Sequence, residues 1–209
     1  MNSDMPRPRL LDVDHVLDVA EELLAARGAA GVTLRTLAAS AEVSNGSLYH
    51  AFGSLPALLG RTWLRAARRF LVSQAERAEA ALPDSAAATV AAACTPADFA
   101  DRHPAAARLL LFVRRDALLG PDLPETLADE LVALDREVVT LLKRLADAHW
   151  GRHDARAVEA MTACVVDLPT ALLRRSLELP GPVGTDARDR LETAVLAVLA
   201  VPLPKERHA

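Results

Sequence analysis

The sequence predicts an all-α protein, and three observations lead to that prediction. Ala and Leu dominate the chain, and both favour helices. Aromatic residues make up only 3% of the chain, and the alternation of apolar and polar residues that is typical of strands is hard to find. Apolar residues recur instead three and four positions apart, which is the spacing of one face of a helix.

The chain is expected to divide into a short head and a longer body. With 209 residues, 51% of them hydrophobic, it is long enough for a small module joined to a larger one. We expect a three-helix head over residues 1–55, frayed at residues 1–12, and a helical body over residues 56–209, with a loose C-terminal tail.

Helix start and stop signals place the elements of the head. Asp14 is expected to cap a first helix that runs to Arg27 and ends at Gly28. Two short helices are expected to follow, one capped by Thr33 and running from Leu34 to about Ala41, and one capped by Ser44 and running through Phe52.

Breaks at Pro and Gly divide the body into longer helices. The expected helices are one with Pro56 in its first turn that runs to about Leu82; Ser85 to Arg102, with a division at Pro96 left open; Pro104 to Leu119; Glu125 to about His149; about Asp154 to Leu179; and one capped by Thr185 that runs to about Ala200.

Charge and cysteine content narrow the class of protein. The net charge of −4 excludes a chain that is basic throughout, so nucleic acid would have to meet a local patch. Residues 28–70 carry five arginines against Glu42 alone. The two cysteines offer neither a disulfide framework nor a Cys-rich zinc site. No apolar run reaches membrane-spanning length and the chain starts with no apolar signal segment, so we expect a cytoplasmic protein.

Residues 33–52 have the pattern of a helix-turn-helix. Ala38 and Ala41 are small where the two short helices have to cross, and Leu48 and Phe52 anchor the second helix. Small polar side chains at a helix N-terminus allow close approach to a DNA groove, and the free amides there attract phosphate. We expect the DNA-facing residues to be Thr33, Arg35, Ser44, Asn45, Gly46, Ser47, Tyr49 and His50, with Thr33 and Arg35 holding the backbone.

The segment VTLRTLAASAEVSNGSLYHAF, residues 32–52, resembles the DNA-binding module of the tetracycline-repressor (TetR/AcrR) family. The match extends back through residues 16–28 and forward to residue 59. The resemblance implies a three-helix DNA-binding head, a helical ligand-binding body, a homodimer, and repression that a small ligand relieves.

Three positions depart from the family pattern. Glu42 stands where the family usually has Gly in the turn, and a positive φ there would cost about 1 kcal/mol. Ala51 replaces the usual His or Tyr, and Leu55 replaces a Lys that commonly contacts phosphate. Arg61 is then a leading phosphate binder, whereas Arg65, Arg68 and Arg69 are expected on a solvated face.

Other clusters of polar residues are expected to have structural roles. His149 and His153 stand four residues apart, but Gly151 interrupts the helix, so we expect a solvated helix end rather than a metal site. Asp98, Asp101 and His103 are expected to serve as caps and surface groups. No catalytic motif is present, so we expect neither an enzyme nor a cofactor.

A ligand pocket is expected between the long helix that starts near Pro56 and the helices after it. Its candidate lining residues are Trp63, Phe70, Cys94, Phe99, Phe112, Trp150, Met161, Cys164 and Asp167. For each of the first eight taken singly, ordinary core packing is the favoured alternative. The scarcity of aromatic residues favours an aliphatic, moderately hydrophobic ligand. For Asp167 three roles stay open: an ion pair across a dimer interface, a polar anchor in the pocket, or plain exposure.

The last two helices are expected to form a dimer interface. Their apolar residues, which fit a four-helix bundle built from two copies, are Ala163, Val166, Ala171, Leu172, Ala194, Leu196, Ala197 and Leu199. The sequence therefore predicts a homodimeric, ligand-responsive repressor that binds a palindromic operator in double-stranded DNA and is released by a small hydrophobic effector. The alternative is a dimeric ligand-binding protein whose head no longer reads DNA, supported by Glu42, Ala51 and Leu55.

Overall fold

The computed structural model of the chain describes residues 11–113, 123–179 and 181–204, and within them it contains helices and no strand. The predicted all-α class is confirmed. The head consists of α1 (Val13–Arg27), the 3₁₀ turn η1 (Ala29–Gly31), α2 (Leu34–Ser40) and α3 (Asn45–Phe52). The body follows with α4 (Leu55–Ala81), α5 (Ser85–Arg102), α6 (Pro104–Phe112), α8 (Glu125–Trp150), α9 (Ala155–Thr162), the π-helical turn η2 (Ala163–Asp167), α10 (Leu168–Glu178) and α11 (Thr185–Leu199).

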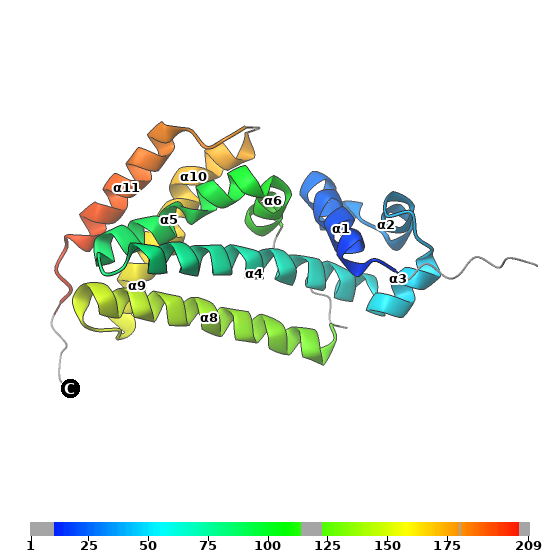
Figure 1. Cartoon of the computed structure of the whole chain (residues 1–209), viewed down its shortest axis with the longest axis horizontal. Helices are drawn as coiled ribbons and strands as arrows, with labels where there is room; N and C mark the ends of the chain where they lie inside the picture. Colours follow the sequence, from blue (N-terminus) through cyan, green and yellow to red (C-terminus); the bar gives the residue numbers. More distant parts are fainter. Residues whose placement is uncertain (1–10, 114–122, 180, 205–209) are drawn as a thin grey trace, which may run out of the picture.

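The long helix α4 joins the two parts of the molecule (Figure 1). Its 27 residues span about 40 Å at 1.5 Å per residue. Leu58, Leu59 and Ala66 pack into the core of the head, whereas Leu64, Ala67 and Leu71 belong to the core of the body. One continuous helix therefore contributes to both hydrophobic cores.

The caps of the two short helices are those that the sequence predicts. The hydroxyl of Thr33 accepts a hydrogen bond from the backbone N–H of Thr36 at 3.1 Å, and the Thr36 hydroxyl oxygen accepts one from the N–H of Thr33 at 3.0 Å. The Ser44 hydroxyl accepts a bond from the N–H of Ser47 at 3.0 Å. These bonds satisfy amides that have no partner inside the helix, so each short helix begins at a defined residue.

Two other cap predictions are wrong. The first helix is capped by Asp12, whose carboxylate accepts from the N–H of His15 at 3.1 Å, while Asp14 lies in the first turn. Both residues are acidic and lie before the same apolar stripe, so the sequence pattern does not distinguish them. Thr185 is the first residue of α11 rather than its cap, which is Gly184 without a side-chain bond.

The body confirms most of the expected helix positions and adds one distortion. The segment expected as one helix from Asp154 to Leu179 runs through α9, η2 and α10, with a π-helical turn at residues 163–167 just before Pro169. Proline lacks an N–H, and its ring crowds the preceding turn of a helix. The wider π-helical turn makes room for the ring of Pro169. Of the helix expected over Pro104 to Leu119, the part after residue 113 lies outside the described residues.

His149 lies in a packed corner rather than at a solvated helix end. Its Nε2 lies 3.2 Å from the carbonyl oxygen of Leu199, which can only accept, so Nε2 carries the proton. Its Nδ1 lies 3.0 Å from the Ser85 hydroxyl, which then donates to it. The imidazole thus joins the start of α5, the end of α8 and the end of α11, and this corrects the expectation for this residue.

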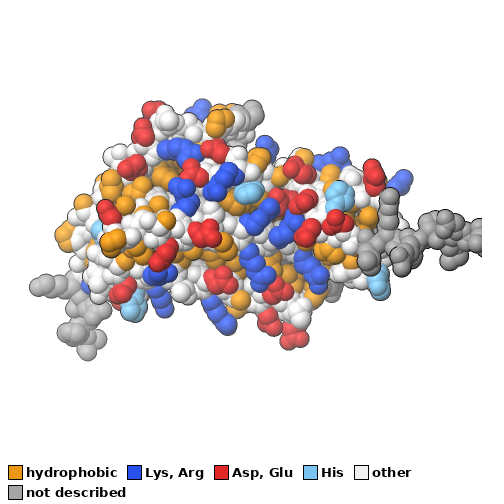
Figure 2. Space-filling model, in the orientation of Figure 1, with side chains coloured by type: hydrophobic (Ala, Val, Ile, Leu, Met, Phe, Trp, Pro, Cys, Tyr) orange, Lys and Arg blue, Asp and Glu red, His pale blue; other side chains and the backbone are white. Residues whose placement is uncertain are grey.

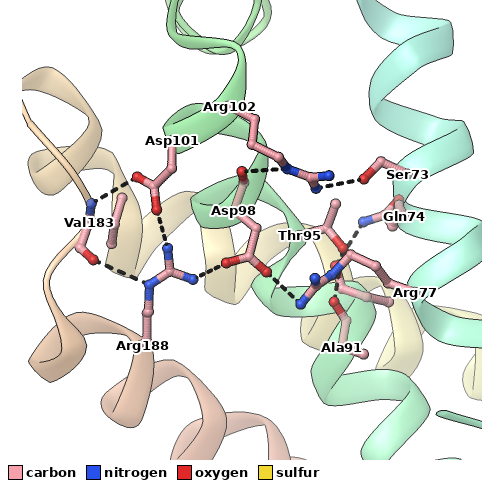
Figure 3. A network of polar contacts seen from close by, with 11 residues as sticks. Ser73, Gln74, Arg77, Ala91, Thr95, Asp98, Asp101, Arg102, Val183 and Arg188 are labelled. Carbon is pink, nitrogen blue, oxygen red and sulfur yellow. Dashed lines mark hydrogen bonds and ion pairs between the residues drawn. The ribbon is translucent and has the colours of Figure 1, made fainter. Parts of the chain in front are cut away.

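The acidic cluster at the end of α5 connects three helices. Asp98 forms ion pairs with Arg77 of α4 and with Arg188 of α11, and Asp101 accepts from Arg188 at 2.7 Å (Figure 3). The backbone N–H of Val183 also donates to Asp101 at 3.3 Å. These carboxylates therefore hold helices together across the body, whereas the sequence had indicated only cap and surface roles.

Glu42, in the turn between α2 and α3, has a φ of 54°, which lies in the left-handed region. A side chain is strained there, so replacing Glu42 by Gly is expected to raise the free energy of unfolding by about 1 kcal/mol. Urea denaturation followed by circular dichroism measures this change.

Glu42→Ala is the matched control, because it removes the charge and keeps a side chain on the strained backbone. It is expected to change stability by less than about 0.5 kcal/mol. Equal stabilisation by both variants would assign the effect to charge and contradict the backbone explanation.

Candidate functional site

The exposed face of α3 presents small and polar side chains at its N-terminal end. Leu48 and Phe52 are 0% and 5% exposed and anchor the helix in the core of the head. Asn45 and His50 are exposed, and Tyr49 is 66% exposed. A large aromatic side chain with that exposure forms little of its own protein's core, so it is available to a partner.

The hydroxyl groups of this face are partly engaged in the helix cap. The Ser44 and Ser47 hydroxyls lie 2.8 Å apart, and Ser44 also caps α3. Gly46, between these two serines, has open space around it, because a Cβ added there would meet only the Ser44 Oγ, at 3.7 Å. The head itself therefore leaves room for a methyl group at Gly46, so packing inside the head does not require glycine at this position.

The five arginines of residues 28–70 have two kinds of surroundings, since some are exposed on the head or near it and others pair with acidic side chains. Arg35 and Arg61 are exposed, and the Arg61 guanidinium lies 5.9 Å from the centre of the Phe52 ring. Arg65 donates to Asp18 at 2.6 Å and to the backbone carbonyl of Asp14 at 3.3 Å.

Further arginines of α4 are also paired with acids. Arg69 pairs with Glu21 of α1, and Arg68 lies 2.9 Å from Glu130 of α8. Figure 2 shows acidic and basic side chains interleaved over this middle part of the molecule. The expectation of a solvated face is therefore corrected for Arg65 and Arg69, which pair with acids of α1, whereas Arg68 is exposed even though it pairs with Glu130.

Glu21 is the most buried carboxylate of this junction. It is 7% exposed, and burial raises its pKa above the ordinary value, against the opposing effect of Arg69 and Arg65. Removing Arg65 or Arg69 would take an opposite charge away from the Glu21 carboxylate, which has little contact with solvent, and would therefore destabilise the folded protein. The ion pairs of this junction thus attach the head firmly to α4.

A cavity of about 290 Å³ lies between α4, α5, α6, α8 and the η2–α10 segment. Three of the residues predicted for a pocket, Trp63, Phe70 and Phe99, lie on its wall. The Phe70 and Phe99 rings meet edge to face with their centres 5.4 Å apart. The remaining wall is largely aliphatic, formed among others by Leu71, Leu110, Leu111, Leu134, Val138 and Leu177.

The other predicted pocket residues lie elsewhere in the body. Cys164 and Met161 are buried in its hydrophobic core, where burial raises the pKa of the Cys164 thiol to about 11. Cys94, Phe112 and Trp150 pack against the same core. Asp167 is exposed in the π-helical turn and does not line the cavity, although its neighbour Val166 does.

Gln74 and Pro96 are among the cavity residues that the sequence analysis did not predict. Pro96 lies inside α5 and has no N–H, so the carbonyl of Ala92 lacks its usual helical donor. The side-chain amide of Gln74 donates to that carbonyl at 3.1 Å, reaching from α4 to α5 (Figure 3). The bond replaces the missing helical bond, and α5 continues through Pro96 without division. A proline inside a predicted helix was the available signal, since it predicts an orphan carbonyl four residues earlier.

Comparisons with known proteins confirm the resemblance stated from the sequence. Residues 16–61 match the family model described as bacterial regulatory proteins, tetR family. A TetR-like transcriptional regulator from Rhodococcus sp. RHA1 has a similar structure, with a TM-score of 0.69, 20% identity, and 93% of this chain and 98% of that chain covered. No curated protein matches the sequence.

Two further similar structures are proteins named FadR, the first of which is described as a fatty acid degradation regulator. FadR from Bacillus halodurans has a TM-score of 0.64 at 14% identity, with 90% of this chain and 97% of that chain covered. FadR from Bacillus subtilis, solved in complex with stearoyl-CoA, has a TM-score of 0.65 at 13% identity, with 89% and 96% covered. The segment 16–61 is thus of the TetR family by sequence, and the chain has the fold of TetR-family transcriptional regulators.

Two classes of site find no support in the described part of the chain. None of its helices combines the length and apolar character that crossing a membrane requires. No three His, Cys, Asp or Glu side chains gather closely enough there to hold a metal ion.

The bond from Gln74 to Ala92 is testable by a double-mutant cycle. Gln74→Leu leaves the Ala92 carbonyl buried without a donor and is expected to cost about 1–3 kcal/mol of stability. In a Pro96→Ala background the new N–H supplies the donor, so the same Gln74→Leu change should cost clearly less. Thermal or urea unfolding of the four proteins measures the coupling, and equal costs in both backgrounds would contradict this role for Gln74.

Proposed function

We propose that the chain is a ligand-responsive DNA-binding transcriptional regulator, a repressor that binds a palindromic operator as a homodimer and is released by a small hydrophobic ligand. In this proposal residues 1–55 are the DNA-binding domain and residues 56–209 bind the ligand and form the dimer. The protein acts by binding rather than by catalysis, and its partners are double-stranded DNA, the effector and a second copy of itself.

The observation that carries the DNA-binding proposal is the composition of the exposed face of α3. This face combines Asn45, Tyr49 and His50 with a glycine and with the free amides at the N-terminus of the capped helix. An Asn side chain can read a base edge, a Tyr hydroxyl can bind phosphate, and the exposed amides attract negative charge. In this proposal, Thr33 and Arg35 at the start of α2 hold the DNA backbone together with Arg61 on α4.

The observation that supports a ligand is the cavity beside α4. At about 290 Å³ it lies at the lower end of the range of about 300–1,000 Å³ that is common for ligand pockets. Its largely aliphatic wall suits an apolar molecule, and the stearoyl-CoA complex of Bacillus subtilis FadR shows that one protein of this fold binds a molecule with a long alkyl chain. Because α4 joins cavity and head, a ligand that favours one arrangement of α4 shifts the population of head positions.

The decisive experiment is a titration of fluorescent duplex DNA from upstream of the protein's own gene, with a scrambled duplex as control, across a salt series. The proposal predicts tight binding to the native duplex, with log affinity falling linearly with log salt concentration. Equal and weak binding to both duplexes, followed by failure to recover any operator from genomic fragments, would favour a ligand-binding protein that does not read DNA.

Gly46 offers a test with its own stability control. Gly46→Ala meets no clash inside the head, and alanine favours helices by about 1 kcal/mol over glycine, so the variant should be at least as stable as the wild type. A methyl group that stands between α3 and a groove should nevertheless lower operator affinity by about tenfold or more, the size of one lost base contact. Unchanged affinity, measured by the same anisotropy titration, would contradict close approach of α3 to DNA.

The proposed dimer interface rests on apolar side chains that are exposed on η2, α10 and α11. Val166, Leu172 and Leu196 are 40%, 37% and 41% exposed, and Ala171 and Ala197 are exposed beside them. Burying such a surface against a second copy gains free energy from the hydrophobic effect. Asp167, exposed next to Val166, is then placed to meet the partner, which is one of the roles left open for it.

The dimer is testable by a pair of matched substitutions. Leu196→Asp is expected to convert the dimer to a monomer in light scattering, because a charge would be buried in the interface. Val139→Asp on α8, at a residue that is 43% exposed, is the control and should leave the dimer intact. A monomeric wild type, or an equal effect of both changes, would contradict this interface.

A further inference from the structure

The wall of the cavity contains one deeply buried amide side chain, that of Gln74. The residue is only 5% exposed, and it lies among apolar neighbours such as Leu71, Phe99 and Leu177. A buried polar group of this kind is costly unless each of its atoms is hydrogen-bonded or open to a polar partner. The orientation of the amide therefore determines which chemistry the cavity offers.

Pro96 fixes that orientation. The carbonyl oxygen of Ala92 can only accept a hydrogen bond, and Pro96 provides no N–H for it. Nε2 of Gln74 lies 3.1 Å from this oxygen and supplies the donor (Figure 3). An amide turned the other way would place two acceptors together, so Oε1 has to be the atom that points away from Ala92.

Oε1 is open to the cavity. Among the described residues, none donates a hydrogen bond to Oε1 of Gln74. Oε1 is also absent from the set of fully buried side-chain atoms that have no hydrogen-bond partner, so it is not sealed off by the protein. Because Gln74 lines the cavity and is otherwise buried, the space that Oε1 touches is the cavity itself. Oε1 is thus a preoriented acceptor, with its position set by the bond on the other side of the amide.

Two other polar side chains on the described wall, those of Thr170 and Asp135, also offer acceptors, whereas the indole N–H of Trp63 is a donor. The Thr170 hydroxyl donates a hydrogen bond to the carbonyl oxygen of Val166 at 2.6 Å, so its own oxygen can act only as an acceptor for another group. Asp135 is the one charged residue among the described lining residues, and it is a carboxylate. None of those lining residues is Lys, Arg or His. Among these acceptors of the described wall, only Oε1 of Gln74 belongs to a buried residue, because Asp135 and Thr170 are exposed.

We infer that the cavity takes an apolar molecule that carries a hydrogen-bond donor, a hydroxyl or N–H group, which it gives to Oε1 of Gln74. This inference rests on the proposed role of the cavity as the effector site and specifies the chemical class of its ligand. Ethers, ketones and ionised carboxylates of the same size offer only acceptors, so they leave Oε1 without a partner. A site built for a donor discriminates against analogues that lack it.

Two isomers test the inference directly. 1-Octanol and heptyl methyl ether have the same atoms and almost the same length, but only the alcohol donates a hydrogen bond. Isothermal titration calorimetry of the full-length protein is expected to show about three- to tenfold tighter binding of 1-octanol, the size of one neutral hydrogen bond. Octanoate at neutral pH is expected to bind more weakly than the alcohol, because it is an acceptor-only anion.

A pair of variants assigns the preference to Gln74. In the Pro96→Ala protein the new N–H and the Gln74 amide can share the two lone pairs of the Ala92 carbonyl, so the preference for 1-octanol should persist. Adding Gln74→Leu to that background removes Oε1 without leaving the carbonyl unpaired, and the two isomers should then bind equally. Circular dichroism and unfolding curves check that both variants fold.

The outcomes separate this inference from the proposed function. Equal binding of the isomers to the wild type, no binding of either, or a preference that survives Gln74→Leu would each overturn it. A confirmed preference for 1-octanol together with failure to bind any operator would contradict the regulator and leave the donor specificity of the cavity standing.

Discussion

The structure depends on the continuity of helix α4. A single helix about 40 Å long contributes Leu58 and Ala66 to the core of the head and Leu64 and Leu71 to the core of the body. Neither core can be repositioned without moving the same rigid element, because interiors are close-packed and do not deform gradually. Helix α4 thus connects α3 to elements that line the cavity, such as α8 and α10, although these elements lie in different parts of the molecule (Figure 1).

Ion pairs and aromatic contacts reinforce that unit on both sides. Arg65 and Arg69 attach the acidic face of α1 to α4, and the burial of Glu21 makes this junction costly to break. Phe99, which lines the cavity, also packs against His103 at the α5–α6 corner, with ring centres 5.0 Å apart. In the proposed regulator, a molecule that fills the cavity would contact side chains that border the head, and this contact is the physical basis that we propose for coupling between the two sites.

Local signals in the sequence were sufficient for most helices and insufficient for most contacts between them. The caps Thr33 and Ser44 were predictable because a hydroxyl before an apolar pattern satisfies its own neighbouring amides. The strained φ of Glu42 was foreseen because a family pattern had glycine there. The partners of Arg65 and Arg69 come from residues 47 and 48 positions away, and no local pattern encodes them. For the cavity, aromatic residues indicated part of the wall, but Gln74 was found only when the packing of α4 against α5 showed which side chain replaces the N–H missing at Pro96.

The measurement that tests the account most directly is the release of operator DNA by a cavity ligand. A preformed complex of the protein with its fluorescent operator duplex would be titrated with 1-octanol and, separately, with heptyl methyl ether, while anisotropy reports the bound fraction. We expect 1-octanol to release the duplex at a lower concentration than the ether does. A complex that stays intact when 1-octanol saturates the cavity would contradict the central claim that the occupancy of the cavity controls the head.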